Sequence, residues 1–580
     1  MGRAVGLKQQ GSKQQGAKMK VIVQEAWMDD VLKMLTEDEK ESMGGRYRWS
    51  TGAGKAKVDI SKWSEKSIKK IHDFLGEKAS AGDRSAKLSQ NVVTQWLEIM
   101  QNPDGQVVGK LENVTAALTA YIKESEHRYI FKQKPDGNFV PWFVINIAYH
   151  EASDRNPAKV DIELAGINTG GSSRHGGRES SHESDSFSIG VEDIRKRTMS
   201  QILEAKGYYL ETQARMESYY KETDRFLAIC NKDGFQMSVT GKAKLIGGWY
   251  CREYRSVGQS GRPAKMVMDP PDKESDADGI HAPFWDKNED KVWTVPIHPV
   301  FEMFDLDEHA DYRVHVNNTE PYVYDDTVDQ KLVLPSDVKE FLTVLIEHSK
   351  NHFEDIVGGK EGGTIVLIEG SPGIGKTLTA EVYSEKMHRP LYKVQSSQLG
   401  ISAGKVEEQL KEVLQRAERW GAILLIDEAD VYIHERGIDI EQNAIVGVFL
   451  RVLEYYRGVL FMTTNRGTSV DDAIISRTTA RFEYEMPSEE DQIKLWTVMS
   501  EQNKVGLTDH EIAKIVNDQP NLSGRDIKNL LKLSMVAAAN KKGRVTPELV
   551  KFVSRFKQSG KSNASLIPDR KRQRIGRDDE

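Results

Sequence analysis

Residues 364–377 read TIVLIEGSPGIGKT, and this stretch decides the fold of the C-terminal half of the chain. It begins as an apolar strand and continues with the spacing G-x-x-x-x-G-K-[ST]. Glycines let a backbone wrap a phosphate group, so that backbone N–H groups and the start of the next helix face the negative charge. The stretch therefore predicts a phosphate-binding loop between a strand and a helix.

This loop predicts ATP and Mg²⁺ as cofactors. The ammonium group of Lys376 is expected to reach the β- and γ-phosphates, and the Thr377 hydroxyl is expected to bind Mg²⁺. The residues expected to hold the nucleotide are Gly370, Ser371, Pro372, Gly373, Ile374, Gly375, Lys376, Thr377 and Leu378.

A second motif, ILLIDEAD at residues 423–430, is an apolar strand that ends in carboxylates. Asp427 suits Mg²⁺, bound through water, and Glu428 suits the orientation and activation of an attacking water. A carboxylate pair at the end of a strand is a weak signal alone. About 50 residues after a phosphate-binding loop it is a strong one, because both motifs then reach the same edge of a sheet.

Short apolar strands alternate with helical stretches from residue 331 onward. The strands read TIVLIEG, PLYKV, AILLID, GVLFMTT and RFEYE. This alternation predicts a parallel sheet covered by helices, an α/β P-loop fold, over residues 331–487. Helical patterns over residues 488–557 predict a helical lid.

With Gly-Lys-Thr, Asp-Glu-Ala-Asp and the Thr464-Asn465 pair that closes another strand, residues 331–557 resemble an AAA+ ATPase. The resemblance makes Asn465 the sensor that faces the γ-phosphate or the attacking water. It makes Arg477, in DAIISR, an arginine finger that acts on a neighbouring subunit, with Arg481 as the second candidate. Because the finger must come from a neighbouring subunit, the resemblance implies a ring-like homo-oligomer and favours a hexamer.

The resemblance also implies residues around the adenine and in the lid. Asp355 and Ile356 match the short segment that flanks adenine, and Leu522–Asn529 resembles the second sensor region. The usual Gly-Ala-Asp of that region is Gly-Arg-Asp here, so Arg525 or Lys528 could face the phosphates, with Arg525 preferred. Three stretches, PLYKVQSSQLG, RAERWGAILLIDEADVYIHERG and FLRVLEYYRGVLFMTTNR, further resemble an AAA group of fungi and bacteria with an unrelated N-terminal extension.

One departure concerns the pore of such rings. Many hexameric relatives that unfold proteins carry an aromatic residue in a loop after the second strand, where it grips polypeptide. The corresponding residues 398–404 read QLGISAG, and Ile401 is the largest candidate side chain. This departure puts the threading of peptide in doubt, although not the ATPase.

The rest of the chain divides by composition. Residues 1–18 and 558–580 predict disordered tails, and residues 19–127 predict a helical N-terminal domain. Residues 128–330 predict a mixed α/β accessory domain, with a mobile Gly/Ser-rich loop at 167–188 and a long amphipathic helix at about 191–229. The chemistry of this domain is not legible in the sequence.

Bulk properties limit where the protein acts. A net charge of −7 over 580 residues argues against a general nucleic-acid coat. No apolar run is long enough to span a membrane, and two cysteines form no disulfide framework, so we expect an intracellular, cytoplasmic protein. The basic run at residues 570–574, RKRQR, could bind nucleic acid or direct nuclear import, or could be a solvated tail.

These patterns favour an Mg²⁺-dependent ATPase that remodels a protein or protein complex engaged by residues 1–330. One alternative is a DNA-associated ATPase whose nucleotide state gates nucleic-acid binding. Another is a scaffold that binds ATP with little turnover, and the presence of Glu428 argues against it.

Overall fold

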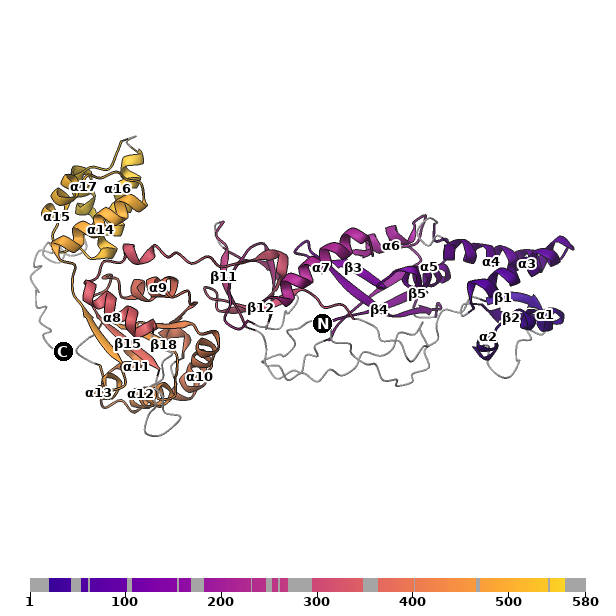
Figure 1. Cartoon of the computed structure of the whole chain (residues 1–580), viewed down its shortest axis with the longest axis horizontal. Coiled ribbons are helices and arrows are strands. Elements are labelled where there is room, and N and C mark those ends of the chain that lie inside the picture. The colour runs from indigo at the N-terminus through magenta and orange to yellow at the C-terminus, as the bar shows by residue number, and fades with distance from the viewer. Residues whose placement is uncertain are drawn as a thin grey trace, which may run out of the picture.

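The computed structural model describes most of the chain (Figure 1). Both terminal tails lie almost wholly outside the described residues, and so do Asp355, Ile356, Ile401 and the basic run at 570–574. The described residues are 20–42, 54–60, 63–101, 107–153, 156–167, 182–230, 232–246, 253–258, 261–269, 295–347, 363–400, 402–465, 470–540 and 543–558.

A parallel sheet with helices on both faces forms the centre of the C-terminal half, as the α/β prediction stated. Its strands are β15 (Thr364–Gly370), β16 (Leu391–Gln395), β17 (Ile423–Asp427), β18 (Val459–Thr464) and β19 (Ala480–Tyr484). The main helices are α8 (Ser336–Glu347), α9 (Lys376–Lys386), α10 (Ala403–Trp420) and α12 (Ile440–Leu453), with short α11 (Asp430–Ile433) and α13 (Asp472–Ile475).

The strand order β16-β17-β18-β15-β19 places the ends of β15, β17 and β18 beside one another. Val366 and Ile368 of β15 share a core with α8 and α9, whereas Ile365 and Leu367 share one with α10 and α12. Because both faces of the sheet are covered, its central strands are apolar at nearly every position.

Four helices form a lid after the sheet: α14 (Glu489–Gln502), α15 (Asp509–Asp518), α16 (Gly524–Asn540) and α17 (Pro547–Gln558). Ser488 caps the first of them, because its hydroxyl accepts a hydrogen bond from the Asp491 N–H at 3.1 Å. Their apolar faces meet around the fully buried Trp496. The lid thus has a core of its own.

The N-terminal region is not entirely helical, which corrects the prediction. It has helices α1 (Met28–Lys33), α2 (Glu37–Ser42), α3 (Glu65–Ser80) and α4 (Arg84–Gln101), but also an antiparallel pair of strands, β1 (Lys20–Gln24) and β2 (Lys55–Asp59). Val21, Val23, Ala56 and Val58 point to one face of the strand pair and are buried against α3 and α4, whereas Ile22 between the two valines is 40% exposed. The strands are too short for their alternation to stand out from the surrounding lysines and glutamates.

Residues 107–227 form a second unit around an antiparallel sheet in the order β6-β5-β4-β3-β7. Helices α5 and α6 cover one face and α7 covers the other. The bounds are α5 (Leu111–Glu124), β3 (Tyr129–Gln133), β4 (Phe139–His150), β5 (Lys159–Ile167), β6 (His182–Gly190), α6 (Met199–Ala205), β7 (Tyr208–Leu210) and α7 (Gln213–Leu227).

Two expectations for this unit need correction. The loop expected at 167–188 is shorter, because Ile167 ends β5 and residues from His182 onward form the edge strand β6, whose serines alternate along an exposed face. The single long helix expected at 191–229 is two helices. Gly207, at φ 78°, ends the first, and β7 separates it from the second.

The predicted accessory domain contains a further antiparallel sheet, in the order β10-β9-β13-β12-β11-β8-β14. Its strands are β8 (Gln236–Val239), β9 (Lys242–Leu245), β10 (Tyr254–Ser256), β11 (Ala264–Met268), β12 (Val300–Asp305), β13 (Ala310–His315) and β14 (Thr319–Pro321). Figure 1 shows this sheet between the N-terminal units and the parallel sheet. In the described part of the chain, no helix is both long and apolar enough for a bilayer crossing.

The seven-stranded sheet is anchored to the parallel-sheet unit by buried contacts. The ring of Phe304, on β12, packs against Trp420 of α10 with ring centroids 5.2 Å apart. Asp269, only 5% exposed, accepts a hydrogen bond from the Trp420 indole N–H at 3.1 Å and forms an ion pair with Arg419. Movement of one unit relative to the other would break this buried, charge-assisted contact, so the two units are firmly connected.

Candidate active site

The loop between β15 and α9 has a backbone that requires glycine. Gly370, Gly373 and Gly375 have φ values of 137°, 86° and 102°, a region that residues with a Cβ rarely adopt. A Cβ atom on Gly373 would also lie 2.8 Å from the Cβ of Arg525, in the first turn of the lid helix α16. The glycine spacing therefore serves both the loop conformation and the close approach of the lid.

Lys376, the first residue of α9, lies at the centre of the site. Its Nζ donates hydrogen bonds of 2.8 Å each to the carbonyl oxygens of Gly370 and Ser371 and to Oδ1 of Asn465. Burial lowers the pKa of Lys376, and the carboxylates of Asp427 and Asp430 oppose that shift. The structure thus brings Lys376 and Asn465 together, although they are far apart in sequence.

Asp427, at the end of β17, gathers three donors. Its carboxylate accepts hydrogen bonds from the Thr377 hydroxyl at 3.0 Å and the Thr463 hydroxyl at 2.6 Å, and it pairs with Lys393 Nζ at 3.1 Å. Burial is the largest influence on the pKa of Asp427 and raises it. The three partners together outweigh burial and hold the pKa below its ordinary value. An ionised carboxylate beside a hydroxyl is a hard-oxygen pair of the kind that Mg²⁺ prefers, so the residues present fit the ion.

Glu428 follows directly and has an unusual backbone. Its φ of 55° lies in the left-handed region, which is uncommon for a residue other than glycine. Its N–H donates to the Thr463 hydroxyl at 3.0 Å. Thr463 therefore accepts from Glu428 and donates to Asp427, which fixes the two carboxylate residues relative to each other.

Sequence reasoning did not single out Thr463 or Lys393. Thr463 lies near the end of β18 and Lys393 lies on β16, and these are the two neighbours of β17 in the sheet. A polar residue near the end of an otherwise apolar strand was a usable signal for Thr463. The sequence contained no comparable signal for Lys393, because its role depends on which strand lies next to β17.

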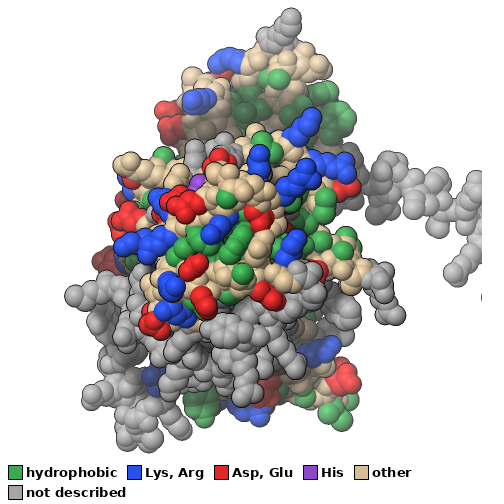
Figure 2. Space-filling view, turned by 90° about the vertical axis from the view of Figure 1, so that its right-hand side faces the viewer, with side chains coloured by type: hydrophobic (Ala, Val, Ile, Leu, Met, Phe, Trp, Pro, Cys, Tyr) green, Lys and Arg blue, Asp and Glu red, His purple; other side chains and the backbone are tan. Residues whose placement is uncertain are grey.

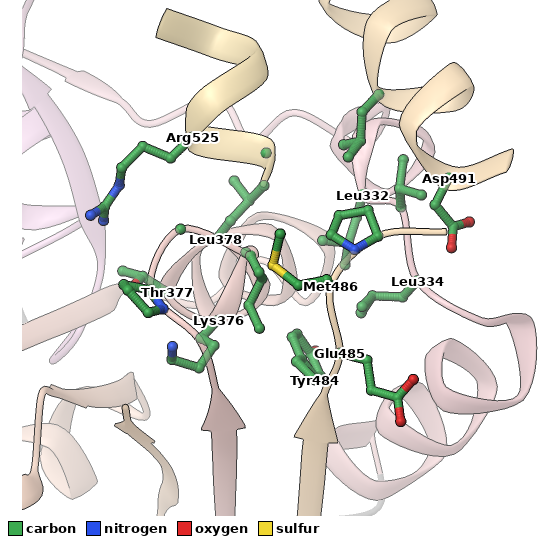
Figure 3. Close-up of a pocket in the computed structure, with 18 of the residues that line it drawn as sticks. Leu332, Leu334, Lys376, Thr377, Leu378, Tyr484, Glu485, Met486, Asp491 and Arg525 are labelled. Atoms are coloured by element: carbon green, nitrogen blue, oxygen red, sulfur yellow. The ribbon is translucent and has the colours of Figure 1, made fainter. Parts of the chain in front are cut away.

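A pocket of about 840 Å³ opens over the loop, and Figure 3 shows how its residues lie. Seven of the nine loop residues line it, and the other two, Gly370 and Ser371, hold Lys376. Asp427, Glu428 and Asn465 line its polar end. The pocket also has an apolar side that sequence reasoning missed, formed by Leu332, Leu334, Val338, Met486 and Leu495. Asp355 and Ile356, the residues predicted to flank adenine, lie outside the described residues.

The lid closes the pocket at the phosphate-binding loop. Arg525 and Lys528 both line the pocket, and the Arg525 N–H donates to the carbonyl oxygen of Gly373 at 3.0 Å. Figure 3 shows the Arg525 side chain extending from the start of α16. The lid therefore contacts the phosphate-binding loop directly.

The two candidate arginine fingers have different surroundings. Arg477 follows α13, is about one-third exposed and is not among the residues that line the described pocket. Its nearest carboxylate is Glu454, with N and O atoms 3.8 Å apart. Arg481 lies on β19 and forms two hydrogen bonds with Glu369 of β15, of 2.6 and 2.9 Å. Arg481 is thus held by a close intrachain pair, whereas Arg477 has the longer contact with Glu454 and a hydrogen bond of 3.3 Å to the carbonyl oxygen of Ala473.

Replacement of Arg481 by Ala is expected to lower the free energy of unfolding by about 2 kcal/mol, because it leaves the buried carboxylate of Glu369 without its charged partner. Urea denaturation of the two proteins measures this difference. Arg451→Ala, which breaks an exposed ion pair with Glu407, is the control and should change stability by less than about 0.5 kcal/mol. Equal effects of the two substitutions would contradict the structural role of Arg481.

Comparison with known proteins identifies the segment that holds this site. Residues 366–486 match the family described as "ATPase family associated with various cellular activities (AAA)". This part of the chain is an AAA ATPase domain, the type of domain that hydrolyses ATP. The resemblance drawn from the sequence motifs is therefore confirmed.

The curated relatives are distant. The chain is 27% identical over 221 residues to the ATP-dependent zinc metalloprotease FtsH of Streptobacillus moniliformis, covering 35% of this chain and 32% of the relative. It is 27% identical over 198 residues to a putative 26S proteasome regulatory subunit homolog of Methanothermobacter marburgensis, covering 32% and 53%. The chain spans about a third of the length of the first of these relatives.

Among solved structures, one chain of the E. coli MS115-1 HORMA:CdnC:Trip13 complex aligns with 39% of this chain and 90% of its own length. The identity is 19% and the TM-score is 0.33, a similarity too weak to carry an argument.

Proposed function

We propose that this protein hydrolyses ATP with Mg²⁺ in order to remodel a protein or protein complex, and that it acts as a ring-like homo-oligomer. In this proposal, ATP hydrolysis in the AAA ATPase domain drives a change in the substrate that the large N-terminal part of the chain holds. Residues 20–330 are the part that would engage the substrate.

One observation carries this proposal: helix α9 connects the nucleotide pocket with the seven-stranded sheet. The helix begins at Lys376 in the phosphate-binding loop. Near its other end, Glu385 accepts hydrogen bonds from the Tyr322 hydroxyl at 2.6 Å, from Lys265 Nζ at 3.0 Å and from the Asp325 N–H at 3.1 Å. Because a helix is stiff, a displacement of its nucleotide-binding end is transmitted to the sheet that contacts its other end.

The chain's own residues suit hydrolysis. In the proposed reaction Lys376 binds the β- and γ-phosphates, Thr377 and Asp427 hold the metal, and Asn465 positions the attacking water. Bound Mg²⁺ would neutralise charge on the phosphates. Glu428 would accept a proton from the water as it attacks the terminal phosphorus, and ADP would leave.

Two observations support an oligomer. Arg477 does not line the pocket of its own chain, so the proposed finger role requires a pocket that another copy brings to it. The lid also has large apolar side chains on its surface that would be covered in such an assembly. These are Leu533, Val536, Phe552 and Phe556, which are 47%, 64%, 48% and 69% exposed.

A protein substrate is favoured by the relatives and by one loop. The names of the relatives, a protease and a proteasome regulatory subunit, describe proteins that act on other proteins. Ile438, in the loop between α11 and α12, is fully exposed, and Ile440, the first residue of α12, is 82% exposed. Two exposed isoleucines where the loop meets the helix would offer a contact surface for apolar polypeptide segments.

The charge pattern favours protein over nucleic acid. Figure 2 shows Lys and Arg side chains interspersed with Asp and Glu over the face of the molecule that it presents. A nucleic-acid surface is instead a continuous positive field. The alternative, a DNA-associated ATPase, would depend on the basic run at residues 570–574, which lies outside the described residues.

Steady-state ATP turnover tests the proposal, with an unfolded protein or duplex DNA added. We expect stimulation by unfolded protein, and we expect the double variant Ile438→Ser, Ile440→Ser to lose that stimulation while its basal turnover is unchanged. Val323→Ser, at a residue 85% exposed elsewhere on the surface, is the matched control. Stimulation by DNA alone, lost steeply with salt and on deletion of residues 559–580, would support the DNA-associated alternative instead.

A further inference from the structure

A second cavity, of about 870 Å³, is lined by residues of the two antiparallel sheets. Figure 1 shows that these sheets lie apart from the parallel sheet of the nucleotide pocket. Strands β3 to β6 line one side of it, and β9, β10, β12 and β13 line the other. Its size is that of pockets that hold small organic ligands. Nothing in the proposed ATPase function uses this cavity.

The cavity contains charged groups of both signs, but most of the charges are already paired. Its carboxylates are Asp136, Glu163, Glu183 and Asp185, and its permanent cations are Lys132, Lys134, Lys244 and Arg313. Lys132 pairs with Asp185, and Arg313 pairs with Glu302 at 2.8 Å. Glu183 accepts from the buried His298 at 3.0 Å, and Glu163 accepts from the Asn146 amide at 3.3 Å.

Two lysines remain without such a partner. Among the described residues, neither Lys134 nor Lys244 has a hydrogen bond to a carboxylate, and both lie near Glu183, which His298 already engages. Lys134 Nζ instead lies 4.8 Å from the ring centre of the buried Trp142. Burial lowers the pKa of Lys134, with Glu183 opposing the shift and the neighbouring lysines adding to it. The cavity therefore has two half-buried lysines, Lys134 and Lys244, neither of which is hydrogen-bonded to a carboxylate in the described structure.

His315 adds an unused donor to the same cavity. The residue is 2% exposed, and its Nδ1 accepts from the Asn317 N–H at 3.3 Å, so the neutral ring carries its proton on Nε2. Within the described structure, Nε2 is buried with no hydrogen-bond partner, since the nearest carboxylate oxygen, of Glu222, is 3.7 Å away. Burial lowers the pKa of His315 to about 3, with a smaller contribution from His298, so the ring is neutral at physiological pH. A buried N–H of this kind needs an acceptor.

We propose that this inter-sheet cavity binds a small organic anion, whose carboxylate or phosphate oxygens accept hydrogen bonds from Lys134, Lys244 and His315. An anionic group placed there neutralises the two lysines and satisfies the imidazole N–H. The ligand would touch both antiparallel sheets at once.

Isothermal titration calorimetry of the full chain tests this, with Mg²⁺ and saturating ADP present so that the phosphate-binding loop is filled. The probes are inorganic phosphate, which tests binding through phosphate oxygens, and succinate, which tests binding through carboxylate oxygens. We expect at least one of them to bind with a Kd of about 1 mM or tighter. Lys134→Gln and Lys244→Gln should each weaken that binding about tenfold or more, because each removes a charge-assisted hydrogen bond.

Lys242→Gln is the matched control, since Lys242 is exposed on the same strand as Lys244 and does not line the cavity. It removes the same charge and should leave the Kd unchanged. Melting temperatures of all variants show whether they fold, and the two lysine variants provide independent readings. The proposal is overturned if neither probe binds, or if Lys242→Gln weakens binding as much as the other two substitutions.

Discussion

Replacement of Glu428 by Gln is expected to lower ATP turnover by about 10²–10⁴-fold while leaving ATP binding intact. The amide keeps the size of the side chain but cannot accept a proton from the attacking water. The residues that bind phosphate and metal, Lys376, Thr377 and Asp427, are unchanged, and the backbone hydrogen bond from Glu428 to Thr463 does not involve the side chain. Phosphate release in steady state and equilibrium binding of a fluorescent ATP analogue measure the two quantities separately.

Glu435→Gln is the control for this substitution, because Glu435 is an exposed carboxylate in the loop after α11. It makes the same chemical change outside the pocket and should leave turnover unchanged. If Glu428→Gln turns over ATP at the wild-type rate, Glu428 is not the general base. If both the wild type and the variant bind ATP without turning it over, the chain is an ATP-gated scaffold rather than a motor.

Replacement of Arg477 by Ala is expected to reduce turnover by about 10³–10⁵-fold, the range in which an arginine finger contributes. The positive charge stabilises the phosphoryl group in the transition state of a neighbouring pocket, so the loss should fall on turnover rather than on ATP binding. The same phosphate-release assay measures it. Arg451→Ala, which removes an exposed arginine of α12, should have little effect.

Mixing two inactive variants tests whether Arg477 acts between subunits. In a mixture of Arg477→Ala with Glu428→Gln, some interfaces combine an intact Glu428 from one subunit with an intact Arg477 from its neighbour. Activity should therefore reappear on mixing. If light scattering shows that the mixture forms oligomers and activity still does not reappear, action in trans is contradicted. If sizing in the presence of ATP finds only monomers, the proposed oligomer is contradicted.

Much of the nucleotide site could be predicted because its parts are contiguous in sequence. The loop from Gly370 to Thr377 forms a single turn from strand to helix, so its glycine spacing and its Lys-Thr pair are legible without any tertiary contact. Asp427 and Glu428 end an apolar strand, and parallel strands place such ends at one edge of the sheet. The α/β class of residues 331–487 followed from the same alternation of strands and helices.

The tertiary structure decided everything that depends on which segments become neighbours. Thr463 and Lys393 join the site because β18 and β16 flank β17, and no local pattern specifies that order. Arg481 forms an intrachain ion pair because β19 lies beside β15. The two short strands of the N-terminal region were missed, because short half-buried strands have a weak periodic signal. The mixed α/β prediction for residues 128–330 likewise did not show that this region contains two separate sheets.

The inter-sheet cavity illustrates the same limit. Lys134, Lys244 and His315 belong to three separate segments, and each would be read in sequence as an ordinary polar residue of a strand or turn. The packing of two antiparallel sheets brings these residues to the lining of one cavity. Local sequence thus determined the groups that bind phosphate, because one short stretch of backbone suffices for that chemistry. Tertiary packing decided the partners of those groups and the second cavity, because burial and charge pairing are properties of surfaces that meet only after folding.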